Sequence, residues 1–273
     1  MATCYRHPSR ETGVSCSNCG RPICPDCMTT TPVGMRCPEC AKQRTPVKRL
    51  RDMAARPRAA YALIAINVVA FLTEQGQGSL TGSAIHGKVV EEGVLDRFDI
   101  SVHHQYWRLL SSGFLHVNLL HVGFNMYLLY LLGTMLEPAI GTSRFVAIYF
   151  TALLAGSFGA LFATAAASLG ASGAVFGLMG AAVVELRARR VSVMESGIGG
   201  LIIINLIFSF TFSNISVGAH IGGLIGGALA ALAIRLADER KAPALGLLAC
   251  VALSAAAVAG AIAVAGARGT GIA

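Results

Sequence analysis

Two residues in uncharged parts of the sequence have the chemistry of a nucleophile and its base. Ser172 stands in the run GASG and His220 in the run GAHIGG, each near a break in a long apolar segment. A serine hydroxyl becomes a good nucleophile when a neighbouring imidazole removes its proton. The uncharged segments that hold both residues contain neither Asp nor Glu. The sequence therefore predicts a Ser-His dyad without a carboxylate.

A second polar pair, His121 and Asn125, occurs earlier in the chain. Residues four apart share one face of a helix, where these two side chains can donate hydrogen bonds to a developing oxyanion. His116 lies five residues before His121, roughly 140° around a helix, so a chelating histidine pair is not expected.

The first 42 residues carry candidate metal ligands in four pairs, each with a two-residue gap. The pairs are Cys4 with His7, Cys16 with Cys19, Cys24 with Cys27, and Cys37 with Cys40. Such a gap lets a turn aim both side chains at one ion, and thiolates select zinc over magnesium or calcium. Eight ligands complete two closed tetrahedral sites, so we expect two structural Zn²⁺ ions and no metal for catalysis.

This small module cannot bury a stable core unaided, and metal ligation should supply much of its folding free energy. The spacing permits three ways of joining the pairs into two sites. The module resembles B-box-like and other cross-braced zinc fingers, and this resemblance implies that pairs one and three share one ion while pairs two and four share the other.

Composition places the rest of the chain in a membrane, because 54% of all residues are hydrophobic and 13% are charged. Apolar runs predict seven spanning helices, and two of these runs are long enough to hold two helices each. The runs are 61–73, 109–136, 145–184 with a break near 168–171, 197–234 with a break near 213–217, and 242–267.

The basic residues indicate how these helices are oriented. They precede the first span (Lys48, Arg49, Arg51, Arg56) and follow the fourth (Arg187, Arg189, Arg190) and the sixth (Arg235, Arg240, Lys241). Since positive flanks stay inside, we expect a multi-pass cell-membrane protein with its N-terminus in the cytoplasm and its C-terminus outside. The metal module then lies in the cytoplasm, a compartment that keeps cysteine thiols reduced. Its expected partner is a cytoplasmic protein. Topology explains the net charge of +8, and no nucleic acid partner is expected.

The membrane portion resembles the rhomboid family of intramembrane serine proteases over roughly residues 60–234. The resemblance rests, in this order, on Trp107-Arg108, HVNLLHVGFN at 116–125, GASG at 170–173 and GAHIGG at 218–223. It implies an all-α polytopic bundle with six core helices and a seventh C-terminal one. The expected parts are a zinc module at 1–42, a basic linker at 43–59, a protease core at 60–236, and an extra helix and tail at 237–273.

The resemblance also implies a role for each polar residue. Ser172 would attack a peptide carbonyl with His220 as base, and His121 and Asn125 would stabilise the oxyanion. Phe176 stands where many members carry tyrosine and is expected to stack on the imidazole. The substrates would be single-span membrane proteins, cleaved near the outer leaflet of the lipid bilayer.

Small residues indicate which helices approach closely. Gly173, Gly177 and Ala181 share one face of their helix, and Gly218, Gly222 and Gly226 share a face of another, so these two faces are expected to pack together.

Two other functions fit parts of the pattern. A catalytically silent relative would bind transmembrane clients without cleaving them, although Ser172 and His220 argue against it. A transporter or channel would use intramembrane histidines to relay protons or metal ions. Such a path would also need acidic or basic residues inside the spans, and the predicted spans contain none.

Overall fold

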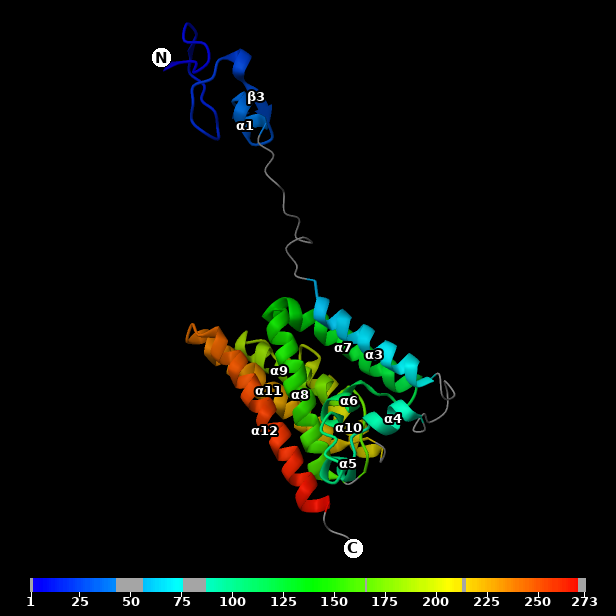
Figure 1. Ribbon diagram of the computed structural model, residues 1–273. Helices are drawn as coiled ribbons and strands as arrows, with labels where there is room; N and C mark the ends of the chain where they lie inside the picture. The colour runs from blue at the N-terminus through cyan, green and yellow to red at the C-terminus, as the bar shows by residue number, and fades with distance from the viewer. Residues whose placement is uncertain (1, 43–55, 76–86, 165, 213–214, 270–273) are drawn as a thin grey trace. The chain divides into compact units, whose positions relative to one another are not determined.

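The computed structural model describes residues 2–42, 56–75, 87–164, 166–212 and 215–269. The chain divides into two compact units, Met1–Ala54 and Ala55–Ala273 (Figure 1). The division falls within the predicted basic linker, 43–59, and most of that linker lies outside the described residues.

The N-terminal unit is built from very short elements. Antiparallel pairs join β1 (Ala2–Thr3) to β2 (Glu11–Thr12) and β3 (Thr29–Thr31) to β4 (Gly34–Arg36). A 3₁₀ turn, η1 (Pro25–Cys27), and the helix α1 (Pro38–Lys42) complete it. Its buried apolar cluster consists of cysteines and Ile23. Such a core is too small to stabilise a fold, which agrees with the expectation that ligands hold this unit together.

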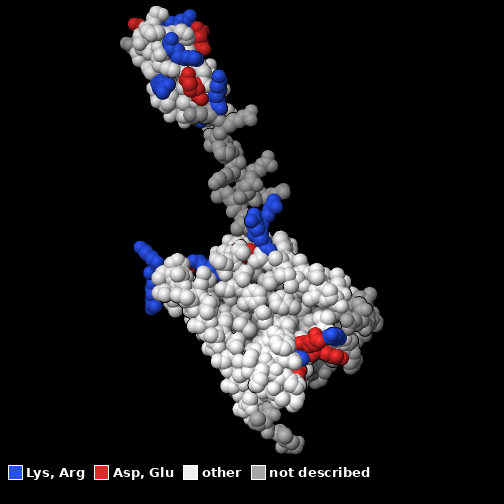
Figure 2. Space-filling model, in the orientation of Figure 1, with Lys and Arg blue, Asp and Glu red and all other residues white. Residues whose placement is uncertain are grey.

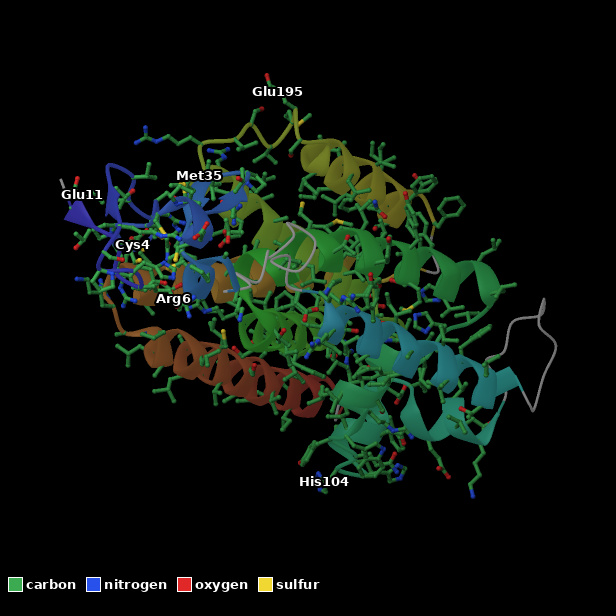
Figure 3. All side chains as sticks on the ribbon, turned by 90° about the horizontal axis from the view of Figure 1, so that it is seen from above. Cys4, Arg6, Glu11, Met35, His104 and Glu195 are labelled. Carbon is green, nitrogen blue, oxygen red and sulfur yellow. The ribbon has the colours of Figure 1, made fainter. Side chains whose placement is uncertain are left out.

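The second unit is an all-α bundle, as the sequence predicts. Its long helices are α3 (Arg58–Gln75), α7 (Leu119–Ile140), α8 (Thr142–Ala163), α9 (Ser172–Ala188), α10 (Ile198–Thr211), α11 (Val217–Glu239) and α12 (Pro243–Gly269). Short helices lie between α3 and α7: α4 (Lys88–Gly93), α5 (Arg97–Ser101), α6 (Arg108–Ser111) and η2 (Ser112–Phe114). Exposed turns follow α5 at His104 and separate α9 from α10 at Glu195 (Figure 3).

Each of the seven predicted segments thus holds one long helix. Among the described residues, α7, α8, α11 and α12 are long and apolar enough to cross a membrane, while α3 and α10 are shorter apolar helices. The helical unit shows a broad uncharged band in Figure 2, between a basic end and a region where acidic and basic side chains lie together. Arg189 and Arg240 follow directly on α9 and α11, which places basic residues at the C-terminal ends of both helices.

The second predicted span begins too early in the sequence. The run 109–136 carries no charge, yet α7 begins only at Leu119, where the Asn118 side chain accepts a hydrogen bond from the N–H of His121 and caps the helix. The earlier residues of this run belong to the short helices α6 and η2 and to a following non-helical stretch, in which Ser112 and His116 are buried polar residues. His116 therefore precedes the helix, and the helical angle between it and His121 does not apply. Their rings are neighbours, 5.0 Å apart between centroids.

Arg108 holds the segment between α3 and α7 together. Its buried guanidinium pairs with Asp99 at 2.9 Å and donates to the carbonyl oxygens of Glu91 and Val94 at 2.7 and 2.8 Å. Trp107 beside it is largely exposed and donates to the carbonyl of Glu92. The carboxylate of Asp99 and these carbonyl oxygens offset the cost of burying the charge.

Glu137 of α7 is a buried carboxylate, and it caps another helix. Its two oxygens accept the N–H groups of Ala59 and Ala60 at 3.0 and 2.9 Å, at the start of α3. Thr142 also donates to it, at 2.8 Å. A carboxylate at a helix N-terminus satisfies free donors and meets the positive end of the helix dipole.

The glycine faces exist, but one of them has a different neighbour from the one expected. A Cβ built on Gly218 would lie 2.2 Å from the carbonyl oxygen of Gly159, and one on Gly222 would lie 2.5 Å from that of Ala155, so this face packs on α8. The face of α11 that meets α9 carries Gly223, whose Cβ would lie 2.0 Å from the carbonyl oxygen of Gly173. The prediction was wrong because the spacing of small residues indicates a packing face but does not indicate which helix packs against it.

The last helix, α12, packs against α8 and α11 inside the same compact unit. Thr151 of α8 donates to the carbonyl oxygen of Cys250 at 3.3 Å and lies 3.1 Å from the Ser254 hydroxyl. The expected extra C-terminal helix is therefore an integral layer of the bundle.

Candidate active site and candidate metal sites

Ser172 is the first residue of α9, and the loop before it is fixed by backbone hydrogen bonds. Ser168 and Leu95 exchange two such bonds, at 2.9 and 3.0 Å, and the N–H of Gly170 donates to the carbonyl of Ser112 at 2.8 Å. Gly170 has a φ of +126°, a conformation that favours glycine. The serine is half-buried, and it stands where the free N–H groups of a helix favour developing negative charge.

His220, in the first turn of α11, lies beside this serine. Its Nε2 is 2.8 Å from Ser172 Oγ, although the residues are 48 positions apart. The backbone contact between Gly223 and Gly173 keeps α9 and α11 close enough for this hydrogen bond. The imidazole is 6% exposed, which shields it from solvent. A Ser-His pair in this geometry can transfer a proton.

Two further side chains surround the imidazole. The Phe176 ring, one turn after Ser172, stacks on it with centroids 4.1 Å apart and an interplanar angle of 16°. The Ser209 hydroxyl of α10 lies 2.5 Å from His220 Nδ1, on the opposite side of the ring from Ser172. Sequence reasoning missed Ser209. The available signal was the pair Asn205 and Ser209, four residues apart in an otherwise apolar helix.

His121 faces the same site from α7. A Cβ built on Gly170 would lie 2.8 Å from His121 Nε2 and 3.8 Å from Ser172 Oγ, so the absent side chain leaves a small space between these two atoms. The N–H of Val117 donates to His121 Nδ1 at 3.4 Å. Since Nδ1 accepts, a neutral imidazole carries its proton on Nε2, which therefore points a donor into this space.

Asn125 lies one turn further along α7 and is 3% exposed. Its amide nitrogen donates to the carbonyl oxygen of His121 at 3.0 Å. The amide has a second N–H for another acceptor. The hydrogen bond that the structure gives to Asn125 thus connects it to His121 and not directly to Ser172.

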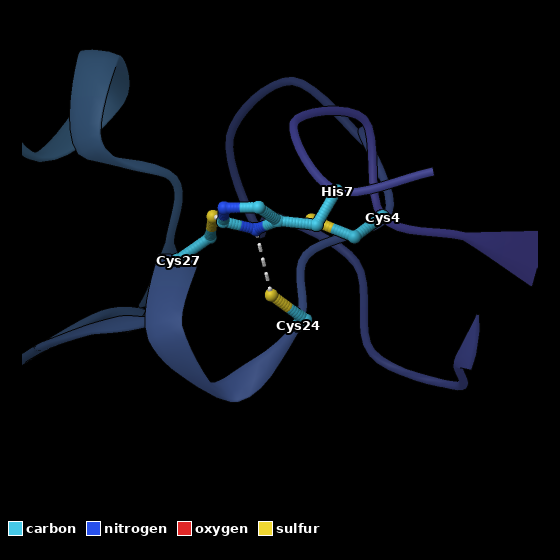
Figure 4. A group of neighbouring side chains, drawn as sticks. All are labelled: Cys4, His7, Cys24 and Cys27. Carbon is cyan, nitrogen blue, oxygen red and sulfur yellow. Dashed lines mark hydrogen bonds between the residues drawn. The ribbon is translucent and has the colours of Figure 1, made fainter. Parts of the chain in front are cut away.

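The N-terminal unit contains two clusters able to bind a metal ion. One joins Cys4, His7, Cys24 and Cys27 (Figure 4), and the other joins Cys16, Cys19, Cys37 and Cys40. Within each cluster the candidate ligand atoms lie within 4.8 Å of one another. This is the cross-braced arrangement, in which the first pair joins the third and the second joins the fourth.

The donor atoms of both clusters suit a tetrahedral thiophilic ion. All eight cysteines of the chain are free thiols. His7 Nδ1 lies 3.3 Å from Cys24 Sγ and 3.4 Å from Cys27 Sγ, which makes Nδ1 the candidate ligand atom of this histidine. In the other cluster the N–H of Cys37 donates to Cys16 Sγ at 3.3 Å, and this is the largest of several hydrogen bonds that lower the pKa of the Cys16 thiol to about 6, while the pKa of the neighbouring Cys37 thiol is raised to about 12. A thiol that ionises readily is a better metal ligand.

Comparison with known proteins identifies relatives of the helical unit. A family model described as the rhomboid domain matches residues 103–237. Rhomboid protease GluP of Bacillus subtilis (strain 168) is 38% identical over 184 residues, which cover 66% of this chain and 36% of GluP. Putative rhomboid protease YdcA of the same organism is 30% identical over 142 residues, 50% of this chain and 71% of YdcA.

A third relative differs in its described activity. Inactive RHOMBOID-like protein 8 of Arabidopsis thaliana is 35% identical over 132 residues, which cover 46% of this chain and 37% of that protein. The chain spans little more than a third of the length of this relative and of GluP.

Proposed function

Because the chain belongs to the rhomboid family of multi-pass membrane proteins, we propose that it is an intramembrane serine endopeptidase with Ser172 as nucleophile and His220 as base. The observation that carries the proposal is the 2.8 Å contact between Ser172 Oγ and His220 Nε2. The similarity to GluP, a rhomboid protease, supports the same reaction class.

The reaction follows from the atoms around Ser172. As Oγ attacks the carbonyl carbon of the substrate peptide, His220 Nε2 takes the hydroxyl proton and a tetrahedral oxyanion forms. The imidazolium then gives this proton to the departing amine, and the acyl group stays on Ser172 as an ester. A water molecule, deprotonated by the same Nε2, attacks the ester and releases the acid and the free serine.

His121, Asn125 and the backbone N–H of Ser172 are the proposed oxyanion donors. The Nε2–H of His121 points into the space beside Ser172 Oγ, and the second amide N–H of Asn125 is available one turn away. Preorganised donors of this kind typically contribute about 10²–10³ in rate. Phe176 would hold the plane of the base through its stacked ring.

The proposed substrates are single-span membrane proteins, cleaved near the outer leaflet of the bilayer. Basic residues follow α9 and α11, and positive ends stay in the cytoplasm. Ser172 and His220 are at the opposite ends of these helices. The N-terminus is then cytoplasmic and the C-terminus lies outside.

The test is cleavage of a single-span substrate by the purified full-length protein in liposomes. Ser172→Ala and His220→Ala should each lower the rate by at least about 10³-fold. Ser168→Ala is the matched serine control, since the hydrogen bonds of Ser168 described above are made by its backbone. Cleavage that persists unchanged in Ser172→Ala would refute the mechanism.

A second candidate function is the binding of transmembrane clients without cleavage. The similarity to an Arabidopsis relative that is named as inactive favours considering it. A silent protein would retain a transmembrane client equally well as wild type and as Ser172→Ala, and neither would yield product. Rapid turnover by wild type alone excludes it.

For the N-terminal unit we propose two structural zinc ions and a role in recruiting or regulating through a cytoplasmic protein. Sites with four protein ligands leave no position for substrate. Deleting residues 1–42 should therefore spare cleavage of a generic substrate. Complete loss of activity in a correctly inserted truncation would contradict separate roles.

A further inference from the structure

Ser209 connects the candidate base to the backbone of α10. Its hydroxyl oxygen lies 2.5 Å from His220 Nδ1 and 2.7 Å from the carbonyl oxygen of Asn205. The side chain is 2% exposed, so water does not compete for either contact. The order of groups is Ser172 hydroxyl, His220 imidazole, Ser209 hydroxyl, Asn205 carbonyl.

Which of these groups can donate and which can only accept determines the direction of each hydrogen bond in the row. A carbonyl oxygen only accepts, so the Ser209 proton points to Asn205 and a lone pair faces His220 Nδ1. Nδ1 must then donate, which places the proton of the neutral imidazole there. Nε2 is left with a lone pair directed at Ser172, which is the state that a general base requires.

We propose that Ser209 is a positioning residue that holds His220 in the Nδ1–H tautomer, in the position that a carboxylate occupies in Ser-His-Asp triads. The inference rests on the proposed function of Ser172 and His220. When Nε2 takes the proton of Ser172, Nδ1–H keeps donating to the same hydroxyl, and the ring does not have to turn. A neutral acceptor stabilises the imidazolium less than a carboxylate does, so the expected effect is moderate.

The same helix provides a matched control. Thr211 also donates to the carbonyl four residues earlier, that of Ile207, at 2.8 Å. Unlike Ser209, it is exposed. Removing either hydroxyl deletes one side-chain hydrogen bond within α10, but only Ser209 contacts His220.

The kinetic test uses the full-length protein in liposomes with a single-span substrate. Ser209→Ala should lower kcat about tenfold with KM unchanged, the effect of losing one buried hydrogen bond. Ser209→Thr, which keeps a hydroxyl, should restore most of kcat, and Thr211→Ala should match wild type. Equal losses in Ser209→Ala and Thr211→Ala would assign Ser209 a merely structural role and overturn the proposal.

A second readout does not depend on proteolysis. Solid-state NMR of protein labelled with ¹⁵N-histidine reports which ring nitrogen is protonated, and the His220 signal is identified by its loss in His220→Ala. Wild type should show protonated Nδ1, and Ser209→Ala should show a mixture of tautomers. An unchanged tautomer in Ser209→Ala overturns the inference, whereas a protein that never cleaves but shows this shift overturns only the proposed function.

Discussion

The two compact units of the chain are stabilised by different kinds of contact. In the N-terminal unit the buried cluster is made of candidate metal ligands and Ile23, and its strands are two or three residues long. In the helical unit, glycine backbones of α8, α9 and α11 touch directly, and the contact between Ser172 and His220 joins α9 to α11. We expect the first unit to depend on a bound ion for its fold, whereas the second depends on close helix packing, which also brings its candidate catalytic residues together.

The largest expected effect is on the first unit alone. Removing the metal should unfold residues 2–42, because zinc binding supplies about 10–16 kcal/mol of apparent free energy in zinc-finger peptides and little else is buried here. Thiol labelling measures this: after chelation Cys4, Cys16, Cys24 and Cys37 should react rapidly, while Cys250 in the helical unit stays protected. Substrate cleavage should persist.

Chelator that has been saturated with zinc beforehand is the control and should leave the labelling unchanged. If these four thiols stay protected after the metal has been removed completely, then the fold of this unit does not depend on an ion.

The second effect concerns the contact between α9 and α11. In Gly223→Ala the new Cβ would meet the carbonyl oxygen of Gly173, the residue after Ser172, at 2.0 Å. The helices must separate, at an expected cost of about 3 kcal/mol in the free energy of unfolding. Cleavage should fall about 100-fold, since a displacement of about 1 Å is enough to do this. Thermal unfolding and product formation are the measurements.

Gly200→Ala is the matched control, because a Cβ on Gly200 of α10 meets no atom within 4 Å. It should leave cleavage unchanged and should not lower the free energy of unfolding, since alanine favours a helix over glycine. If Gly223→Ala cleaves substrate at the wild-type rate, the distance between Ser172 and His220 does not depend on the backbone contact between Gly223 and Gly173.

These two regions also differ in how far sequence predicts them. In the N-terminal unit, two ligands separated by two residues are expected to bind the same ion, so local spacing predicted the pairs, and a resemblance predicted which pairs join into the two clusters. In the helical unit, the apolar runs predicted the helices and placed Ser172 and His220 at helix starts.

What failed in the helical unit depends on tertiary packing. Gly218 and Gly222 marked a true face, but its partner is α8 and not α9. Leu119 begins a helix that was predicted to start ten residues earlier, because an uncharged run can include turns whose polar groups are bonded inside the protein. A lone serine such as Ser209 is common in apolar helices, and only its position beside His220 distinguishes it.

A smaller effect is expected at the start of α3. Glu137→Ala leaves the buried N–H of Ala60 and that of Ala59 without their acceptor, which should lower the free energy of unfolding by about 2 kcal/mol. Glu137→Gln keeps one carbonyl oxygen and should lose about half as much. Glu239→Ala, which breaks an exposed pair with Arg235, should cost less than about 1 kcal/mol. If Glu137→Ala lowers the free energy of unfolding no more than Glu239→Ala does, Glu137 does not stabilise the protein as a helix cap.

The smallest effect tests how far the helical unit depends on one ring. Phe176→Leu removes the ring stacked on His220 and should slow cleavage about two- to tenfold, which matches the roughly 0.5–1.5 kcal/mol of an aromatic pair. Phe176→Tyr keeps the ring and should stay within about threefold of wild type, although the added hydroxyl needs a partner at a position that is 2% exposed. Phe210→Leu, on the exposed side of α10, should change nothing. Equal rates for Phe176→Leu and wild type would mean that the hydrogen bonds with Ser172 and Ser209 alone orient the imidazole.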